Sequence, residues 1–285
     1  MKANIKLGVI LTDSFRSYGR HWKPLLAVGA ATVMMNLLPL LSGTSDDIVF
    51  KQLIALGMGF FLAPIFTFGL YRYLLKVWNG EQLGWKELLY YCGNLKRYGH
   101  TLLFQIYFGL LMLVFFFFAV LVVMIVLVVM MFSVSGVSSE ISSWFSLILY
   151  LLLFAGGLWL EMRLFLVFYC YLFQEEVSAW QAIGDSFSLM KGNCWKLLLL
   201  MIVQGILGFL CIGIILLLFV GMEHIDFLMA FVENGYIPTL FLFFAVGLIF
   251  TPLYWLMNAG FAYKVIQQTD WANQSEVFNH IVDEP

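Results

Sequence analysis

Six long apolar runs constrain this chain more than any other feature of its sequence. They cover residues 24–41, 53–73, 102–132, 144–173, 197–221 and 237–263. An α-helix rises about 1.5 Å per residue, so about 20 apolar residues cross the roughly 30 Å hydrocarbon core of a bilayer. Only 11% of the 285 residues are charged, whereas about 25% are charged in a soluble domain. The sequence therefore predicts an all-α, polytopic membrane protein with six transmembrane helices.

Basic residues lie at alternate ends of these runs. Lys and Arg gather before the first run, between the second and third, between the fourth and fifth, and directly after the sixth. The other three connections are poor in both residue types. Because cytoplasmic loops collect Lys and Arg, we expect both termini in the cytoplasm and three short loops outside. Residues 1–268 would then form a single membrane domain, followed by a short acidic cytoplasmic tail over residues 269–285.

A moderately polar segment with helical apolar spacing precedes each outward-going run. The spaced residues are Leu11, Phe15, Tyr18 and Trp22 in the first segment, Trp85, Leu88, Cys92 and Leu95 in the second, and Trp180, Ile183, Phe187 and Met190 in the third. Intervals of three and four residues place such side chains on one face of a helix. The pattern predicts three amphipathic helices in the cytoplasmic interface of the membrane.

The first and third of these segments also share sequence words. Asp-Ser-Phe occurs at residues 13–15 and 185–187, and Gly-x-x-Trp-Lys occurs at residues 19–23 and 192–196. We interpret the chain as a three-fold parallel repeat with units at about 1–80, 81–176 and 177–268. Each unit would be an interfacial helix followed by a transmembrane hairpin, and all units would share one orientation, unlike the inverted repeats of many transporters.

The Trp-Lys pairs, Trp22–Lys23 and Trp195–Lys196, are the predicted interfacial anchors. An amphipathic ring and a snorkelling amine are both favoured at headgroup depth. The preceding glycine accepts the left-handed conformation that ends a helix. The segment would therefore turn the chain from the membrane surface into the membrane. A purely anchoring role and a lipid-sensing role both stay open.

A few polar residues lie inside the apolar runs and are candidates for a function. Glu161 and Arg163 are two residues apart, so they point to different faces of a helix. They are either boundary charges at the end of a long helix or a polar element that faces the bundle interior. Tyr254 and Asn258 share a face, next to Pro252. Hydrogen bonds between helices explain the uncharged candidates, which are Gln105, Gln204, Thr251, Tyr254 and Asn258.

Known catalytic and metal-binding patterns are not found in the sequence. The four histidines lack a second ligand at metal-binding spacing, and there is no zinc helix, nucleophile elbow or Gly-rich phosphate loop. A net charge of −2 gives no electrostatic reason to expect nucleic acid as a partner. We therefore expect no enzyme activity, metal or cofactor. The expected partners are membrane lipids, together with another membrane protein or a second copy of the chain.

Residues 173–176 read Phe-Gln-Glu-Glu, and residues 182–193 read Ala-Ile-Gly-Asp-Ser-Phe-Ser-Leu-Met-Lys-Gly-Asn before Trp195 and Lys196. This stretch resembles bacterial six-helix membrane families of unknown function, which are related to the membrane domain fused to some glycerophosphoryl diester phosphodiesterases. Residues 13–23 and 252–264 resemble them too. The resemblance implies a bacterial cytoplasmic membrane and no agreed activity. We expect no phosphodiesterase domain, since only residues 264–285 follow the last run.

Three functions are compatible with these patterns. The first is a non-enzymatic membrane protein in envelope maintenance or an accessory subunit of a membrane complex. The second is a transporter or channel-like protein for an apolar or weakly polar solute. The third is a lipid-acting membrane enzyme, which would need an acid–base set that the sequence lacks. A cavity that opens to the cytoplasm and is lined by the fourth and sixth spans would favour transport or lipid binding, whereas a closed bundle with no cavity would favour the accessory role.

Overall fold

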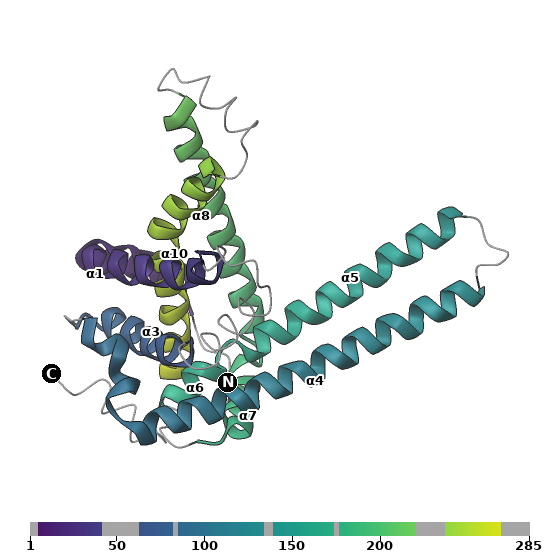
Figure 1. Ribbon diagram of the computed structural model, residues 1–285, viewed down its shortest axis with the longest axis horizontal. Helices are drawn as coiled ribbons and strands as arrows, with labels where there is room; N and C mark the ends of the chain where they lie inside the picture. Colours follow the sequence, from purple (N-terminus) through teal and green to yellow (C-terminus); the bar gives the residue numbers. More distant parts are fainter. Residues whose placement is uncertain are drawn as a thin grey trace.

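The computed structural model describes residues 5–41, 63–81, 85–133, 139–173, 177–220 and 237–268. The regular secondary structure in these ranges is helical throughout (Figure 1). The elements are α1 (Leu7–Leu41), α3 (Ala63–Trp78), the 3-10 helix η3 (Trp85–Gly93), α4 (Leu95–Ser133), α5 (Ser139–Leu164), α6 (Val167–Phe173), α7 (Ala179–Met190), α8 (Cys194–Val220) and α10 (Ile237–Gln267). The expected all-α fold class is confirmed for this part of the chain.

Three stretches of the described residues are long and apolar enough to cross a membrane. They are Leu95–Met124, Leu151–Phe173 and Cys194–Gly213, which overlap the third, fourth and fifth predicted runs. Within the described residues the protein is therefore helical and has three candidate membrane-spanning helices, which indicates a membrane protein. The count of six spans stays a prediction. The acidic tail and most of the three outer loops fall outside the described residues.

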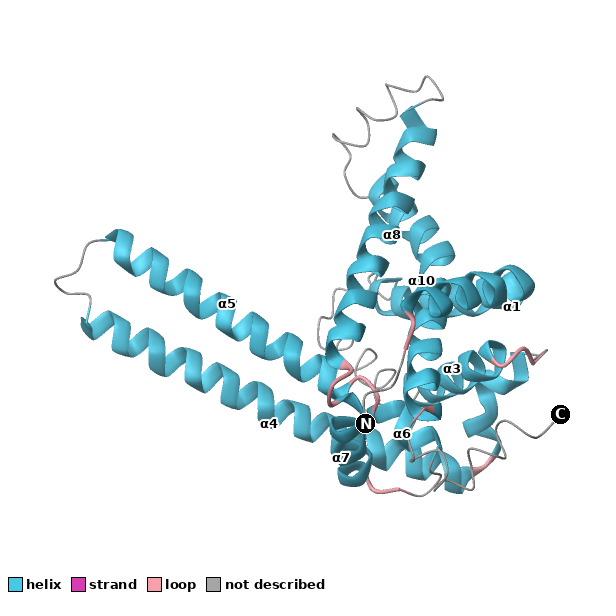
Figure 2. Ribbon diagram, turned by 180° about the vertical axis from the view of Figure 1, so that it is seen from behind, coloured by secondary structure: helices cyan, strands magenta, loops and turns pink. Residues whose placement is uncertain are grey.

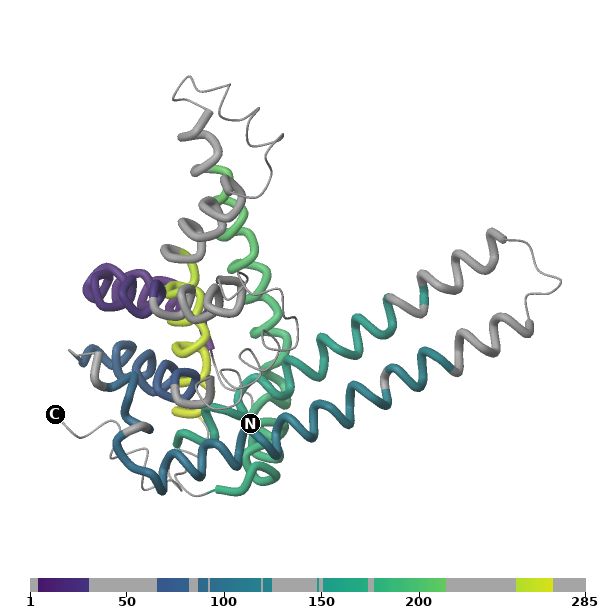
Figure 3. Tube along the Cα trace, in the orientation of Figure 1, coloured from purple at the N-terminus to yellow at the C-terminus, as the bar shows by residue number. Residues whose placement is uncertain are grey.

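The long helices leave a common region in different directions (Figure 1). α4 and α5 form the two arms of a long hairpin that extends on one side of the molecule (Figure 3). α8 points along another direction, and α1 and α3 lie on the opposite side from the hairpin, also when the molecule is seen from behind (Figure 2). α10 packs against α1, α3 and α8 and so joins these elements.

The buried core lies where the helices meet. We call this region the base: α3, η3, α6, α7, the N-terminal part of α4 and the C-terminal part of α10. Its centre is Phe68, which is fully buried and whose ring centroid lies 6.0 Å from that of Tyr91, 5.6 Å from Phe104, 5.5 Å from Phe168 and 5.1 Å from Tyr171. Such ring pairs stabilise a core by about 0.5–1.5 kcal/mol each beyond the area that they bury.

Gly69 allows η3 to lie directly on α3. A Cβ atom at this position would collide with the backbone carbonyl of Leu88. Since a backbone cannot move away as a flexible side chain can, only glycine permits this approach. The neighbouring Phe68 and Leu88 are both buried at the same contact. The second predicted interfacial segment is therefore a 3-10 helix held against α3 over Trp85–Gly93.

The helical conformation is interrupted near the end of each of the three predicted interfacial segments. His21 is non-helical inside α1, with φ −117 and ψ 24. Asn94 separates η3 from α4, and residues 191–193 separate α7 from α8. Gly192 has φ 86 there, the left-handed conformation expected of the glycine that ends a helix. In the first segment the break falls at His21, because Gly19 continues the helix. The duplication itself stays a prediction.

Candidate functional site

A cavity of about 600 Å³ lies between α4, α5, α6 and α10. Its wall is mainly aromatic and includes Phe108, Phe115, Phe116, Phe165, Phe168 and Trp255. α4 supplies the first three rings, the turn after α5 and α6 supply the next two, and α10 supplies the tryptophan. α4 and α5 do not pack closely against each other, and residues of both helices line the cavity. The fourth and sixth predicted spans thus both line it.

Polar groups enter this aromatic cavity from two helices. Glu161 extends from α5, and Tyr254 and Asn258 extend from α10. The spacing of four on α10 places its two side chains on one face, as the sequence predicts. Glu161 forms no ion pair within the described part of the chain, and its side chain is exposed to the open cavity. Three of the four predicted intramembrane polar residues therefore meet at one place.

Arg163, the fourth of these residues, lies at a different contact. Its Nη1 donates a hydrogen bond to the carbonyl oxygen of Phe187 at 2.8 Å, and the hydroxyl of Ser186 donates to the carbonyl of Arg163 at 2.6 Å. The guanidinium also lies over the ring of Trp159, 5.4 Å from its centroid. Arg163 thus joins the end of α5 to α7. The two charges face apart, as their separation predicts, and Arg163 is a structural link in this arrangement.

A second layer of polar atoms supports the α10 side of the cavity. Gln204 on α8 is buried, and its Nε2 donates to Oδ1 of Asn258 at 2.9 Å and to the carbonyl of Tyr254 at 3.4 Å. This bond confirms the expected hydrogen bonding between helices. The cavity also takes Tyr71 from α3 and Tyr169 from α6. Sequence analysis missed both tyrosines as lining residues. Their only signal was the similarity of residues 71–74 to residues 169–172.

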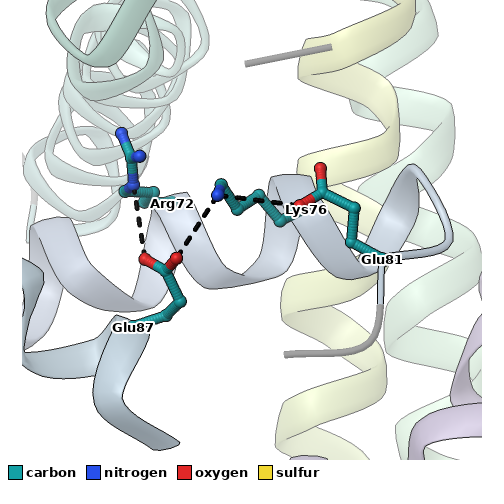
Figure 4. Close-up of polar contacts among 4 residues, drawn as sticks. All are labelled: Arg72, Lys76, Glu81 and Glu87. Atoms are coloured by element: carbon teal, nitrogen blue, oxygen red, sulfur yellow. Dashed lines mark hydrogen bonds and ion pairs between the residues drawn. The ribbon is translucent and has the colours of Figure 1, made fainter. Parts of the chain in front are cut away.

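A charged cluster in the base holds η3 against α3 (Figure 4). Glu87 forms an ion pair with Arg72 at 3.5 Å and accepts a hydrogen bond from the Lys76 amine at 3.3 Å, and Lys76 also pairs with Glu81 at 3.6 Å. The guanidinium of Arg72 lies 3.8 Å from the ring centroid of Tyr90. Burial raises the pKa of the Glu81 carboxyl, although the nearby Lys76 ammonium opposes the shift. Arg72 and Lys76, which belong to the basic residues used to predict topology, therefore also form ion pairs that hold the base together.

The predicted interfacial anchors are mostly exposed. Trp22 is 48% exposed and Trp195 is 69% exposed. Lys23 is exposed with its amine 5.7 Å from the ring centroid of Trp22, and Lys196 is half-buried. The serines of the two Asp-Ser-Phe words lie deeper than these anchors, since Ser14 and Ser186 are both fully buried. Each Trp-Lys pair thus starts a long helix with its indole ring on the surface.

Within the described residues, no group of three or more His, Cys, Asp and Glu side chains could hold a metal ion. The polar set of the large cavity consists of one carboxylate, one carboxamide and phenol groups. Such a set can accept and donate hydrogen bonds and attract a cation at Glu161. Its chemistry is that of ligand binding by an apolar cavity with few polar contacts.

Comparison with known proteins gives one family. The sequence profile of a family described as "Protein of unknown function (DUF975)" matches residues 18–268. No curated protein matches the chain, and no solved structure matches it. A relation to the membrane domain of glycerophosphoryl diester phosphodiesterases is not shown by these matches. Because the family profile spans most of the sequence, the chain belongs to DUF975, a family of unknown function.

Proposed function

We propose that this protein is a non-enzymatic membrane protein that binds an amphiphile, an apolar or weakly polar solute of the membrane, in the large cavity. The single observation that carries the proposal is the convergence of Glu161, Tyr254 and Asn258 on an aromatic cavity of about 600 Å³. Ligand cavities of proteins commonly measure about 300–1,000 Å³ and combine apolar walls with a few polar groups. Of the functions expected from sequence, transport or binding of an apolar solute fits this arrangement better than a closed accessory bundle.

The cavity favours a particular ligand chemistry. Phe108, Phe115 and Phe116 offer an apolar surface to a hydrocarbon chain. The Glu161 carboxylate accepts hydrogen bonds and favours a hydroxyl or ammonium donor at the other end of the ligand. An ionisable residue in a membrane segment is costly unless it serves such a contact. The ligand would therefore have a long apolar chain and a donor head group.

The proposal includes the membrane setting. The chain would cross a bacterial cytoplasmic membrane six times, with three parallel units and both termini in the cytoplasm. The alternation of basic residues supports this orientation. Single cysteines at Ser138 or Glu233 should react with an impermeant reagent added outside, and a cysteine at Gln274 should not. The reverse labelling pattern would contradict the orientation.

The decisive experiment is to purify the protein in native lipid and to identify the bound lipids and proteins by mass spectrometry. Gly157 lines the cavity, and a Cβ there would meet no atom within 4 Å. Gly157→Leu should therefore fold, fill the cavity and lower ligand occupancy about tenfold, the effect of losing about 1.4 kcal/mol of binding free energy. Glu161→Gln should keep the chain contact and weaken binding of the donor head.

Gly156→Leu is the matched control for this experiment. Gly156 adjoins Gly157, has the same open surroundings and is not part of the cavity wall. Its replacement should leave the bound ligand unchanged. Equal occupancy in the Gly157→Leu, Gly156→Leu and unchanged proteins would contradict the proposal. An empty cavity together with a copurifying protein would replace it with the accessory-subunit function.

A further inference from the structure

Two arginines lie against a single tyrosine ring in the base. The guanidinium carbon of Arg72, on α3, lies 3.8 Å from the ring centroid of Tyr90, and that of Arg97, on α4, lies 4.6 Å from it. Tyr90 belongs to η3, so three elements meet at this ring. We call Arg72, Tyr90 and Arg97 the arginine–tyrosine cluster. The function proposed above makes no use of it.

The two arginines of the cluster differ in their acidic partners. Arg72 forms an ion pair with Glu87. Arg97 is exposed, and its side chain forms no ion pair or hydrogen bond with the residues that the structure describes. The N–H donors of its guanidinium can therefore bind a ligand. Because this guanidinium already contacts a ring, it loses less freedom on binding than a mobile side chain would lose.

Positive charge exceeds negative charge around the cluster. Among the described residues the local cations are Arg72, Lys76, Lys96 and Arg97, and the local carboxylates are Glu81 and Glu87. Both carboxylates already pair with Lys76. Cations that are held near one ring repel each other, so a bound anion would stabilise this arrangement. The ligand that fits the cluster is therefore an anion.

The position of Arg97 in the chain limits which anion can reach it. Arg97 lies in the first turn of the candidate membrane span Leu95–Met124, which has 30 residues. A helix of that length measures about 45 Å, whereas the hydrocarbon core of a bilayer measures roughly 30 Å. The first turns of this helix would therefore extend to the depth of the lipid phosphates.

An exposed apolar stripe continues from the cluster along α4. Leu103, Tyr107 and Leu110 are all exposed, and their intervals of four and three residues place them on one face of the helix. Lys96, which is also exposed, lies seven residues before Leu103 and so belongs to the same face. A lipid with its phosphate at the start of α4 would find an apolar surface for its acyl chains on the same helix.

We infer that the arginine–tyrosine cluster is a binding site for the head group of an anionic phospholipid, with Arg97 donating hydrogen bonds to the phosphate. The neighbouring cations disfavour phosphatidylcholine, because they repel its trimethylammonium group. The cluster does not belong to the wall of the large cavity. The inference rests on the membrane setting of the proposed function, and it does not require a ligand in that cavity.

The experiment uses the full-length protein in detergent, with phosphatidylglycerol and phosphatidylcholine of the same acyl chains added in equal amounts. Native mass spectrometry counts the lipids of each kind that stay bound, and phosphatidylglycerol should be retained in preference. Arg97→Gln should lower its retention about fivefold, since one basic residue near anionic head groups contributes about 1 kcal/mol. Glycerol 3-phosphate should not displace the lipid, because it has no acyl chains to contact α4.

Two comparisons separate a site from general attraction to a basic surface. Arg16 is exposed on α1 and, among the described residues, has no ion pair and no ring contact, so Arg16→Gln should leave lipid retention unchanged. Tyr90→Phe should also leave it unchanged, whereas Tyr90→Leu should lower it, because Arg97 loses the ring that it contacts. Should Tyr90→Leu fail to fold, Arg97→Gln still decides, since that exposed side chain forms no ion pair within the described residues.

Three outcomes would overturn the inference. Equal losses in Arg97→Gln and Arg16→Gln would mean that anionic lipid is attracted by charge without a site. Equal retention of the two lipids would mean that the head-group charge is not recognised. Displacement by glycerol 3-phosphate would assign the cluster to a soluble phosphate. None of these outcomes depends on Gly157→Leu or on the cavity ligand, so the two proposals can fail separately.

Discussion

The base and the α4–α5 hairpin are both rich in aromatic residues, but they differ in what covers those residues. In the base, Phe68 and Phe261 are completely buried by other parts of the protein. Along α4, Phe116 is 70% exposed and Phe117 is 61% exposed. The apolar stretch Leu95–Met124 has none of its most apolar window buried inside the protein. The same type of side chain is therefore buried within the protein in the base and exposed on its surface along α4.

This difference assigns a separate source of stability to each region. In the base, the aromatic side chains are buried by other parts of the protein. Ring contacts together with ion pairs hold the helices in place there. The hairpin offers its apolar surface outward, which fits contact with lipid chains. The large cavity lies where the two regions meet, since residues of the hairpin and of the base both line it.

The sharpest test makes one change in both regions. Phe68→Ala should lower the free energy of unfolding by about 4 kcal/mol, because it leaves a cavity among packed rings. Phe117→Ala should change it by less than about 0.5 kcal/mol in detergent, since this exposed ring faces the surrounding lipid or detergent and leaves no cavity in the protein. Denaturant unfolding of the purified proteins measures both. Similar losses in the two variants would contradict the division into a packed base and an outward-facing hairpin.

Adding one methyl group tests the same comparison through the backbone. Gly69→Ala should destabilise the protein by about 3 kcal/mol, because the new Cβ would collide with the carbonyl of Leu88 and displace η3. Gly109→Ala on α4 meets no atom within 4 Å, and it should be neutral or stabilise by up to about 1 kcal/mol through helix propensity. Thermal unfolding in the same detergent should separate the two variants. A tolerated Gly69→Ala would show that η3 does not lie closely on α3.

The smallest expected effects concern the charged cluster of the base. Glu87 pairs with both Arg72 and Lys76, so Glu87→Gln should cost about 2 kcal/mol, a moderate value because the pairs are partly exposed. Glu81→Gln is the matched control and should cost less than about 0.5 kcal/mol at neutral pH. Lys76 retains Glu87 in that variant. Equal losses would mean that Glu87 does not bridge the two helices.

The carboxyl of Glu81 also predicts that the stability of the protein depends on pH. Burial raises the pKa of Glu81 above its ordinary value of 4.5, so the folded protein keeps this proton to a higher pH than the unfolded chain does. Its contribution to stability should therefore fall as the pH rises through the interval above 4.5. Melting temperatures measured across this interval should lose that component of their slope in Glu81→Gln.

Much of the helical architecture could be predicted, because helices and their ends depend on nearby residues. The turn at Gly192 follows from the freedom of glycine at positive φ. The face shared by Tyr254 and Asn258 follows from a spacing of four. The sequence names Glu161 together with these residues as candidates for a polar site, but its approach to their face depends on packing, since α5 and α10 are far apart in the sequence. For the same reason, the contact of Arg163 with Phe187 could only be seen in the structure.

The sequence by itself determined the helical class, the apolar stretches suited to a membrane, and the alternate connections in which basic residues gather. These properties depend on the solvation and the local backbone preferences of each segment, which neighbouring residues decide. Only the tertiary structure decided which faces meet: α3 against η3 over Gly69, α8 against α10 at Gln204 and Asn258, and α5 near α10 at the large cavity. Those contacts depend on packing between distant segments, where shape and unpaired polar atoms select one arrangement from many that are equally apolar.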